Sequence, residues 1–254
     1  RSSNQQLQIL EWLARLVAEE FTGASPLRVL SVGCGSGILD LPLLDAVAAD
    51  GRKVIYTAVD PNPVACRRFR EGFEALNPPN VELVVLEHGI ERLEPDLRFD
   101  LIHAVHSLYY LSDPADSIDN LLGRLAPQGR LAVLQAPKAE LNLLSDCFWP
   151  TSGEDAIWFS GCVRQHLDDS GLAFREDRID AKVDVTPCFE DKSSGGRMLL
   201  DFITQADSDA FHTSIKEGCR TYLRSVAETV SGQVMVEHPV DAFVVEPCPA
   251  SPTP

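Results

Sequence analysis

Short apolar runs alternate with helix-length segments over the first half of the chain. The runs are RVLSVG (28–33), KVIYTAVD (53–60), VELVVLE (81–87), FDLIHAVH (99–106) and GRLAVLQA (129–136). Because these runs have no regular polar face, they are typical of parallel strands that are buried on both sides. Their alternation with helices predicts a doubly wound α/β sheet.

The segments that flank this core have other patterns. Residues 4–21 place leucine and valine at helical spacing, which predicts an amphipathic helix before the first strand. After Pro137 the expected elements are a helix near 154–171, a strand in 171–180, a helix near 208–230 and a last strand in 240–247. The final residues, 248–254, are rich in proline, and we expect a disordered tail there.

Charge and cysteine content narrow the partners that the chain can have. It carries 38 Asp and Glu against 22 Lys and Arg, a net charge of −16, which repels nucleic-acid phosphates and anionic bilayers. We therefore predict neither a nucleic-acid nor a membrane partner. With no membrane-length apolar stretch and no signal-like start, the expected location is the cytoplasm. The seven cysteines form no C-x-x-C pair, so we predict free thiols and no metal site.

Three glycines alternate in GCGSG, where the first predicted strand turns toward a helix. A helix that begins there leaves N–H groups unpaired and directed outward, and a ligand reaches them only where no side chain intervenes. We therefore assign Gly33, Gly35 and Gly37 to a cofactor site, with Cys34 contributing its backbone N–H. A dinucleotide-binding motif has its third glycine at the position of Ile38. A purely structural glycine turn is the alternative.

A carboxylate ends the second predicted strand. Asp60 lies where an acidic side chain accepts both hydroxyls of a ribose, so the glycine turn and Asp60 together indicate an adenosine-containing cofactor. Nicotinamide dinucleotides also contain adenosine, which leaves an oxidoreductase as a second enzyme class. Ile38 and the segment LAPQGRLAVL count against that class.

Four segments resemble class I S-adenosylmethionine-dependent methyltransferases in order and spacing: VLSVGCGSG (29–37), AVDPN (58–62), FDLIHAVHSLYYL (99–111) and LLGRLAPQGRLAVL (121–134). The resemblance implies a Rossmann-like methyltransferase fold, a mostly parallel seven-stranded sheet whose last strand, VDAFVVE, is inserted antiparallel. It also implies S-adenosyl-L-methionine as the cofactor. On this basis we add four residues to the cofactor site: Asn62, Gly89, Ile90 and His106.

Three further segments resemble the histamine N-methyltransferase family: FDLIHAVHSLYYLSDP (99–114), VDVTPCFEDKSSGGRMLLDFIT (183–204) and DAFVVEP (241–247). In that family a carboxylate on the first helix and two amide side chains surround the acceptor. The matching residues here are Asn4, His106 and His238, so the carboxylate that would pair with a substrate ammonium is missing. The resemblance also implies aromatic pocket walls at Tyr109, Tyr110, Trp149 and Phe189.

These assignments predict methyl transfer to a small molecule, with a nitrogen of an amine, an imidazole or an amino acid derivative as the expected acceptor. His106 is the candidate catalytic residue that relays the acceptor's proton to solvent, and His238 is the second candidate. His103 points to the opposite face of the strand and is predicted to be structural. The alternatives are O- or S-methylation of a small metabolite and a non-catalytic cofactor-binding regulator. The sequence leaves the oligomeric state open.

The same reasoning predicts the domain organisation. We expect residues 1–247 to form a single methyltransferase domain with C-terminal insertions. Within it, residues 1–25 are an N-terminal helical lid, residues 26–136 the cofactor-binding half and residues 137–247 the substrate-side half.

Overall fold

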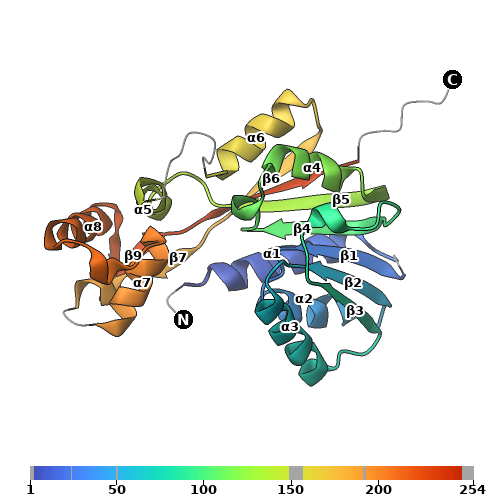
Figure 1. Cartoon of the computed structure of the whole chain (residues 1–254), viewed down its shortest axis with the longest axis horizontal. Helices are drawn as coiled ribbons and strands as arrows, with labels where there is room; N and C mark the ends of the chain where they lie inside the picture. The colour runs from blue at the N-terminus through green and yellow to red at the C-terminus, as the bar shows by residue number, and fades with distance from the viewer. Residues whose placement is uncertain (1–2, 24, 50, 149–156, 191–192, 248–254) are drawn as a thin grey trace. The chain divides into compact units, whose positions relative to one another are not determined.

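The computed structural model describes residues 3–23, 25–49, 51–148, 157–190 and 193–247. The chain forms two compact units (Figure 1). The large unit comprises Ile9–Gln135, Cys162–Asp177 and Ala242–Pro254, and the small unit comprises Arg1–Gln8, Ala136–Gly161 and Arg178–Asp241. The predicted tail, 248–254, lies outside the described residues.

Seven strands form one sheet, as the sequence predicted, in the order β3-β2-β1-β4-β5-β10-β6. They are β1 (Leu27–Val32), β2 (Val54–Val59), β3 (Val81–Leu86), β4 (Phe99–Val105), β5 (Leu125–Gln135), β6 (Phe174–Ile179) and β10 (Val240–Val245). The pairs β1–β2, β1–β4, β2–β3 and β4–β5 are all parallel. β10 lies between β5 and β6, as an inserted last strand should; its antiparallel direction stays a prediction.

The strand order reverses between β1 and β4, which are neighbours at the centre of the sheet. Figure 1 shows β2 and β3 continuing on one side of β1, and β5 beyond β4 on the other. At such a switch point the loops after the two strands diverge and leave a crevice at their carboxyl ends. The loops that follow β1 and β4 therefore form the expected ligand-binding region.

Within the described ranges, five helices accompany the sheet: α1 (Gln5–Glu20), α2 (Asp40–Ala48), α3 (Pro63–Leu76), α4 (Pro114–Leu122) and α6 (Ser160–Asp169). α1 matches the predicted N-terminal helix and buries Trp12, Leu13 and Leu16 on one face. α6 is shorter than predicted, and residues 154–156 of that prediction lie outside the described part of the chain. None of the helices that the structure describes is long and apolar enough to cross a bilayer.

The prediction of strands buried on both sides is wrong for β3. Its residues are only partly buried or exposed, and Val84 is 39% exposed. β3 is the edge strand next to β2, so one of its sides has no neighbouring strand. The central strands β1, β2 and β4 are buried almost throughout, as predicted.

The small unit contains a second sheet that the sequence patterns did not reveal. Its strands β7 (Lys182–Asp184), β9 (Gln233–Glu237) and β8 (Glu228–Val230) pair antiparallel in that order. Helices α5 (Leu141–Phe148), α7 (Ser194–Thr204) and α8 (Thr213–Val226) share a buried core with this sheet. That core includes Val183, Leu200, Leu223 and Val236.

The predicted helix over 208–230 is wrong at its C-terminal end. α8 stops at Val226, and β8 takes the residues that follow. The chain then reverses at Ser231 and Gly232, which have φ angles of 52° and 84°. Two successive left-handed residues favour a two-residue hairpin turn, so a local β signal overrides the helical spacing.

Candidate active site

The glycine turn after β1 adopts left-handed backbone at all three glycines, with φ angles of 71° at Gly33, 54° at Gly35 and 73° at Gly37. Left-handed backbone is costly for residues with a Cβ, which explains the composition of the turn. α2 begins only at Asp40, three residues after the last glycine.

The backbone N–H groups of this turn bond within the protein, which corrects the expectation that they point outward. The N–H groups of Gly33 and Cys34 both donate to the carbonyl of Val59, at 2.9 and 3.2 Å. The N–H of Gly37 donates to the carbonyl of Cys34 at 3.0 Å. The turn is therefore a rigid frame rather than a row of free donors.

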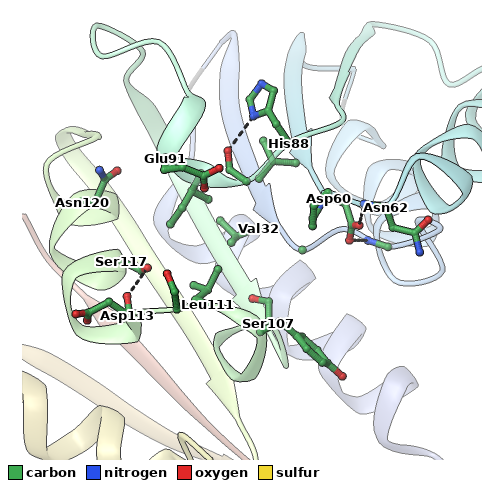
Figure 2. A pocket seen from close by; sticks show the side chains of 18 of the residues that line it. Val32, Asp60, Asn62, His88, Glu91, Ser107, Leu111, Asp113, Ser117 and Asn120 are labelled. Atoms are coloured by element: carbon green, nitrogen blue, oxygen red, sulfur yellow. Dashed lines mark hydrogen bonds between the residues drawn. The ribbon is translucent and has the colours of Figure 1, made fainter. Parts of the chain in front are cut away.

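A cavity of about 950 Å³ lies in the large unit, beside this turn (Figure 2). Of the predicted cofactor residues it is lined by Gly33, Gly35, Asp60, Asn62, Gly89, Ile90 and His106. Cys34 and Gly37 are not among its lining residues. The sequence analysis missed the wall formed by Asp113, Asp116, Ser117 and Asn120, as well as His88, Glu91 and Ser107.

Space at the turn differs from one glycine to the next. A Cβ on Gly33 would lie 2.7 Å from the Cβ of Ser107, and one on Gly37 would lie 2.4 Å from the ring of Phe69. A Cβ on Gly35 would meet nothing within 4 Å. Gly33 and Gly37 therefore allow close packing inside the protein, whereas Gly35 leaves open space for a ligand.

The carboxylate of Asp60 is held in position by two backbone donors. Its Oδ2 accepts the N–H of Gly35 at 2.9 Å, and its Oδ1 accepts the N–H of Asn62 at 2.8 Å (Figure 2). Asn62 in turn caps α3 by accepting the N–H groups of Val64 and Ala65. Each carboxylate oxygen keeps a further lone pair, so Asp60 can still accept the two hydroxyls of a ribose.

The lining of the cavity is acidic. Asp60, Glu91, Asp113 and Asp116 contribute four carboxyl groups, and none of the described lining residues is Lys or Arg. Figure 2 shows Asp60 at one end of the cavity and Asp113, the N-cap residue of α4, at the other. Such a lining disfavours a pyrophosphate and favours a positively charged ligand.

Ser107 adds a polar group that the fold leaves open. Its Oγ is buried and has no hydrogen-bond partner among the described residues. A buried hydroxyl without a partner usually marks a position that a ligand or water fills. The orphan hydroxyl, the space above Gly35 and the acidic lining together fit a cofactor with an adenosine and a cationic group.

His106 follows β4 and enters the cavity lining through an unusual backbone conformation. Its φ angle is 50°, and its N–H continues the sheet by donating to the carbonyl of Leu134 at 2.9 Å. The Nδ1 atom lies 3.5 Å from the hydroxyl of Tyr109, and the two rings stack with centroids 6.2 Å apart. Strained residues of this kind gather at functional sites.

Three polar side chains form a buried chain across the start of α2, β2 and β4. The hydroxyl of Tyr56 donates to Oδ1 of Asp40 at 2.7 Å and lies 2.8 Å from Nε2 of His103. Because the Tyr56 hydroxyl already uses its hydrogen in the bond to Asp40, it accepts the second hydrogen bond, and Nε2 of His103 is the donor. Burial, together with Asp40, raises the pKa of Tyr56, and burial lowers the pKa of His103. His103 is thus a structural residue of the sheet, as predicted.

Tyr56→Phe is expected to lower the free energy of unfolding by about 2–3 kcal/mol, because Asp40 and His103 lose the hydroxyl between them. Urea unfolding followed by circular dichroism measures the change. The control is Tyr110→Phe, since Tyr110 is 74% exposed. Its expected change is below about 0.5 kcal/mol, and equal losses in the two variants would contradict a stabilising role for the buried chain.

Cys34 is unsuited to nucleophilic chemistry. Its side chain is buried, and burial, followed by the nearby Asp40, raises the pKa of its thiol far above the ordinary value. The reactive form of cysteine is the thiolate, which such an environment disfavours. The described residues also contain no cluster of His, Cys, Asp and Glu that could hold a metal ion.

The predicted acceptor residues divide between the two units. Tyr109 and Tyr110 belong to the large unit, where Tyr110 lines the cavity. Asn4, Phe189 and His238 belong to the small unit. Trp149 lies outside the described residues.

In the small unit, two of these residues are already engaged. Oδ1 of Asn4 accepts the backbone N–H of Lys182 at 2.8 Å, which ties the start of α1 to β7. The ring of Phe189 faces the guanidinium of Arg224, 4.6 Å from its centroid. Neither contact depends on a ligand, so both residues have a structural role.

His238 has the properties of a neutral, buried imidazole. Burial lowers its pKa to about 4. Its backbone N–H donates to the carbonyl of Ala181 at 2.7 Å, and its carbonyl accepts the side-chain N–H of Gln5 at 2.8 Å. Its Nδ1 has no hydrogen-bond partner among the described residues.

Acid is expected to destabilise the protein through His238. The unfolded chain binds this proton near the ordinary pKa of 6.5 and the folded chain only near 4, so protons favour unfolding between these values. The free energy of unfolding is lower by about 3 kcal/mol at pH 4, and this effect is absent above pH 7. Urea unfolding from pH 7 to pH 4 measures it, and His238→Asn should have the shallower pH dependence. The same slope in both proteins would exclude His238 as its source.

Fold and cavity together place the chain among the class I S-adenosylmethionine-dependent methyltransferases. The comparison with protein families agrees: a model described as a methyltransferase domain matches residues 2–174, and the chain belongs to that family. Its cofactor is S-adenosyl-L-methionine.

The curated relatives that the chain matches include several histamine N-methyltransferases. The B form from Xenopus laevis is 25% identical over 201 residues, which cover 70% of this chain and 65% of that enzyme. The enzyme from Danio rerio is 23% identical over 274 residues, which cover 97% of this chain and 92% of that enzyme. The chain therefore resembles histamine N-methyltransferases, although it spans just under two thirds of the length of the Xenopus B form.

Solved structures support the fold. The YcgJ protein from Bacillus subtilis matches with a TM-score of 0.60 and 14% identity, over 93% of this chain and 97% of that one. The plantazolicin methyltransferase BpumL, solved in complex with SAH, matches with a TM-score of 0.53 and 12% identity, over 96% and 86% of the two chains. At these identities the likeness concerns the fold.

Proposed function

We propose that this methyltransferase acts on a nitrogen atom of a small molecule: an amine, an imidazole or an amino acid derivative. The observation that carries the proposal is the imidazole of His106 on the wall of the cofactor cavity, next to Tyr109. An imidazole can accept a proton at neutral pH, which a nitrogen acceptor requires. The likeness to histamine N-methyltransferases supports a nitrogen acceptor.

When bound, the cofactor supplies a methyl group on a positively charged sulfur. Asp60 holds the ribose hydroxyls, and the bare backbone at Gly35 leaves room beside them. His106 accepts the proton that the acceptor nitrogen gives up so that its lone pair is available. Tyr109 orients the ring of His106. Because the methyl donor is already reactive, correct alignment supplies most of the rate, about 7–11 kcal/mol.

The residues that we propose as acceptor contacts are Tyr109, Tyr110, His238, Asn4 and Phe189. Tyr109 and Tyr110 provide aromatic faces for a cationic or aromatic acceptor. His238 offers its unpartnered Nδ1 as a hydrogen-bond acceptor. Asn4, whose amide oxygen bonds Lys182, contributes its amide nitrogen. Phe189 contributes the face of its ring opposite Arg224.

A transfer assay with methyl-labelled S-adenosylmethionine tests the proposal. The panel contains imidazoles, aromatic amines and amino acids, with phenols and thiols as the competing acceptor classes. We expect label in a nitrogen-bearing acceptor, identified by mass spectrometry of the product. Label only in phenols or thiols, or tight binding of S-adenosylhomocysteine with no transfer at all, would overturn the nitrogen assignment.

A further inference from the structure

Ser107 begins a short helix without capping it. It precedes η2 (Leu108–Tyr110), and its carbonyl accepts the N–H of Tyr110 at 3.2 Å. A serine at this position ordinarily accepts a backbone N–H with its side chain, but the hydroxyl of Ser107 makes no capping bond. The residue is only 5% exposed, and its Oγ has no hydrogen-bond partner among the described residues. The fold therefore leaves a buried hydroxyl uncommitted.

The place of this hydroxyl is fixed by the glycine turn and by the end of β4. A Cβ on Gly33 would lie 2.7 Å from the Cβ of Ser107 and 3.6 Å from its Oγ, so the serine side chain packs directly on the first glycine of the turn. Ser107 also lines the cavity of the large unit (Figure 2). A buried polar atom without a protein partner is usually satisfied by a ligand or by water, and here the cavity is the source of either.

The order of the strands gives the direction in which the cofactor extends. β1 lies between β2 and β4, and β3 lies beyond β2. The cavity is lined by Gly89 and Ile90 after β3, by Asp60 after β2 and by Ser107 after β4. With the ribose on Asp60 and the base beside Ile90, the sulfur and the amino acid part of the cofactor extend across β1 toward Ser107.

The amino acid part of the cofactor carries an ammonium group and a carboxylate, and the cavity treats them differently. Its four carboxyl groups can accept hydrogen bonds from the ammonium, whereas none of the described lining residues is Lys or Arg. The cofactor carboxylate therefore needs a neutral donor. Among the lining hydroxyls, that of Ser117 already donates to the carbonyl of Asp113 at 2.6 Å, and Tyr110 and Ser112 are exposed. Ser107 offers a donor shielded from water, where a hydrogen bond to a charged group is strongest.

We propose that the hydroxyl of Ser107 donates a hydrogen bond to the carboxylate of the cofactor's amino acid part. Ser107 then makes the site prefer the intact cofactor to adenosine compounds that lack this carboxylate. It is a binding residue that fixes the end of the cofactor opposite the ribose. This role holds whichever atom accepts the methyl group, so it is independent of nitrogen methylation.

Calorimetric titration with three ligands tests this role: S-adenosylhomocysteine, its decarboxylated analogue, and 5′-methylthioadenosine, which lacks both the ammonium and the carboxylate. For Ser107→Ala in the whole chain we expect the affinity for S-adenosylhomocysteine to fall by about 10- to 100-fold. The affinities for the two ligands without a carboxylate should change by less than about twofold, which also shows that the rest of the site is intact.

Three controls separate a hydrogen bond from an effect on the fold. Ser170→Ala is the same substitution at an exposed position of the large unit outside the cavity lining, and it should bind all three ligands like the wild type. Ser107→Cys keeps the shape of the side chain but is a weak donor, so it should lose nearly as much affinity for S-adenosylhomocysteine as the alanine variant. Thermal unfolding of Ser107→Ala without ligand should begin no earlier than in the wild type.

Each contrary outcome has its own meaning. Unchanged affinity of Ser107→Ala for S-adenosylhomocysteine overturns the role of Ser107, and so does wild-type affinity in Ser107→Cys, because packing would then explain the alanine result. An equal loss for the decarboxylated analogue assigns the hydroxyl to the ammonium instead and overturns the carboxylate contact. An equal loss for all three ligands, or a clearly lower unfolding temperature, reveals a structural role and overturns it as well. Transfer of label only to phenols or thiols would overturn nitrogen methylation and leave the role of Ser107 standing.

Discussion

His106→Ala is expected to lower kcat by about 10²- to 10⁴-fold, because the variant has no imidazole to accept the proton of the acceptor nitrogen. The affinity for S-adenosylhomocysteine should change little, since Asp60 and the glycine turn remain. Single-turnover methyl transfer measures the first quantity, and calorimetric titration measures the second.

Two further variants sharpen the interpretation of His106. His106→Gln keeps a polar side chain that can form hydrogen bonds but takes up no proton, so it should be nearly as slow as the alanine variant. Tyr109→Phe removes only the hydroxyl beside Nδ1, and its loss of rate should be smaller. Collapse of cofactor binding in His106→Ala, with the same turnover per bound cofactor, would show that the proton role is wrong.

Asp60→Ala is expected to weaken the binding of S-adenosylhomocysteine by about 10- to 100-fold, the value of one or two charge-assisted hydrogen bonds. Asp60→Asn should lose nearly as much affinity for S-adenosylhomocysteine. Both carboxylate oxygens accept backbone N–H groups, from Gly35 and Asn62, so an amide would direct its NH₂ group at one of these donors.

Calorimetric titration decides the Asp60 prediction. Asp96→Asn, a change of the same charge at an exposed position, is the matched control and should bind like the wild type. Unchanged affinity in Asp60→Ala would exclude the ribose contact. Circular dichroism of each variant establishes that the fold is retained.

The large unit was predictable because its signals are local and redundant. The central strands are apolar along their whole length, so burial on both faces is visible in the sequence. Asp60 and His106 are each placed by the end of a strand, and position alone identified them as candidates. The edge strand β3 has a similar composition, and only tertiary pairing distinguishes it from the central strands.

Other features depend on contacts that no local pattern encodes. β8 has three residues, all exposed, so it shows no alternation of buried and exposed positions. Asp113 accepts the N–H of Asp116 as the N-cap of α4. In the sequence, an aspartate at this position indicates only a helix cap. Its place on the cavity wall follows from the fold.

The acidic lining of the cavity has a consequence for the catalytic cycle. Under the proposed function, the four carboxyl groups attract the sulfonium of the methyl donor, and after transfer the sulfur is an uncharged thioether. The spent carrier has then lost the charge that these groups attract, whereas fresh donor still has it. We therefore expect these carboxyl groups to favour the exchange of product for donor after each turnover, and added salt should narrow the difference in affinity between the two.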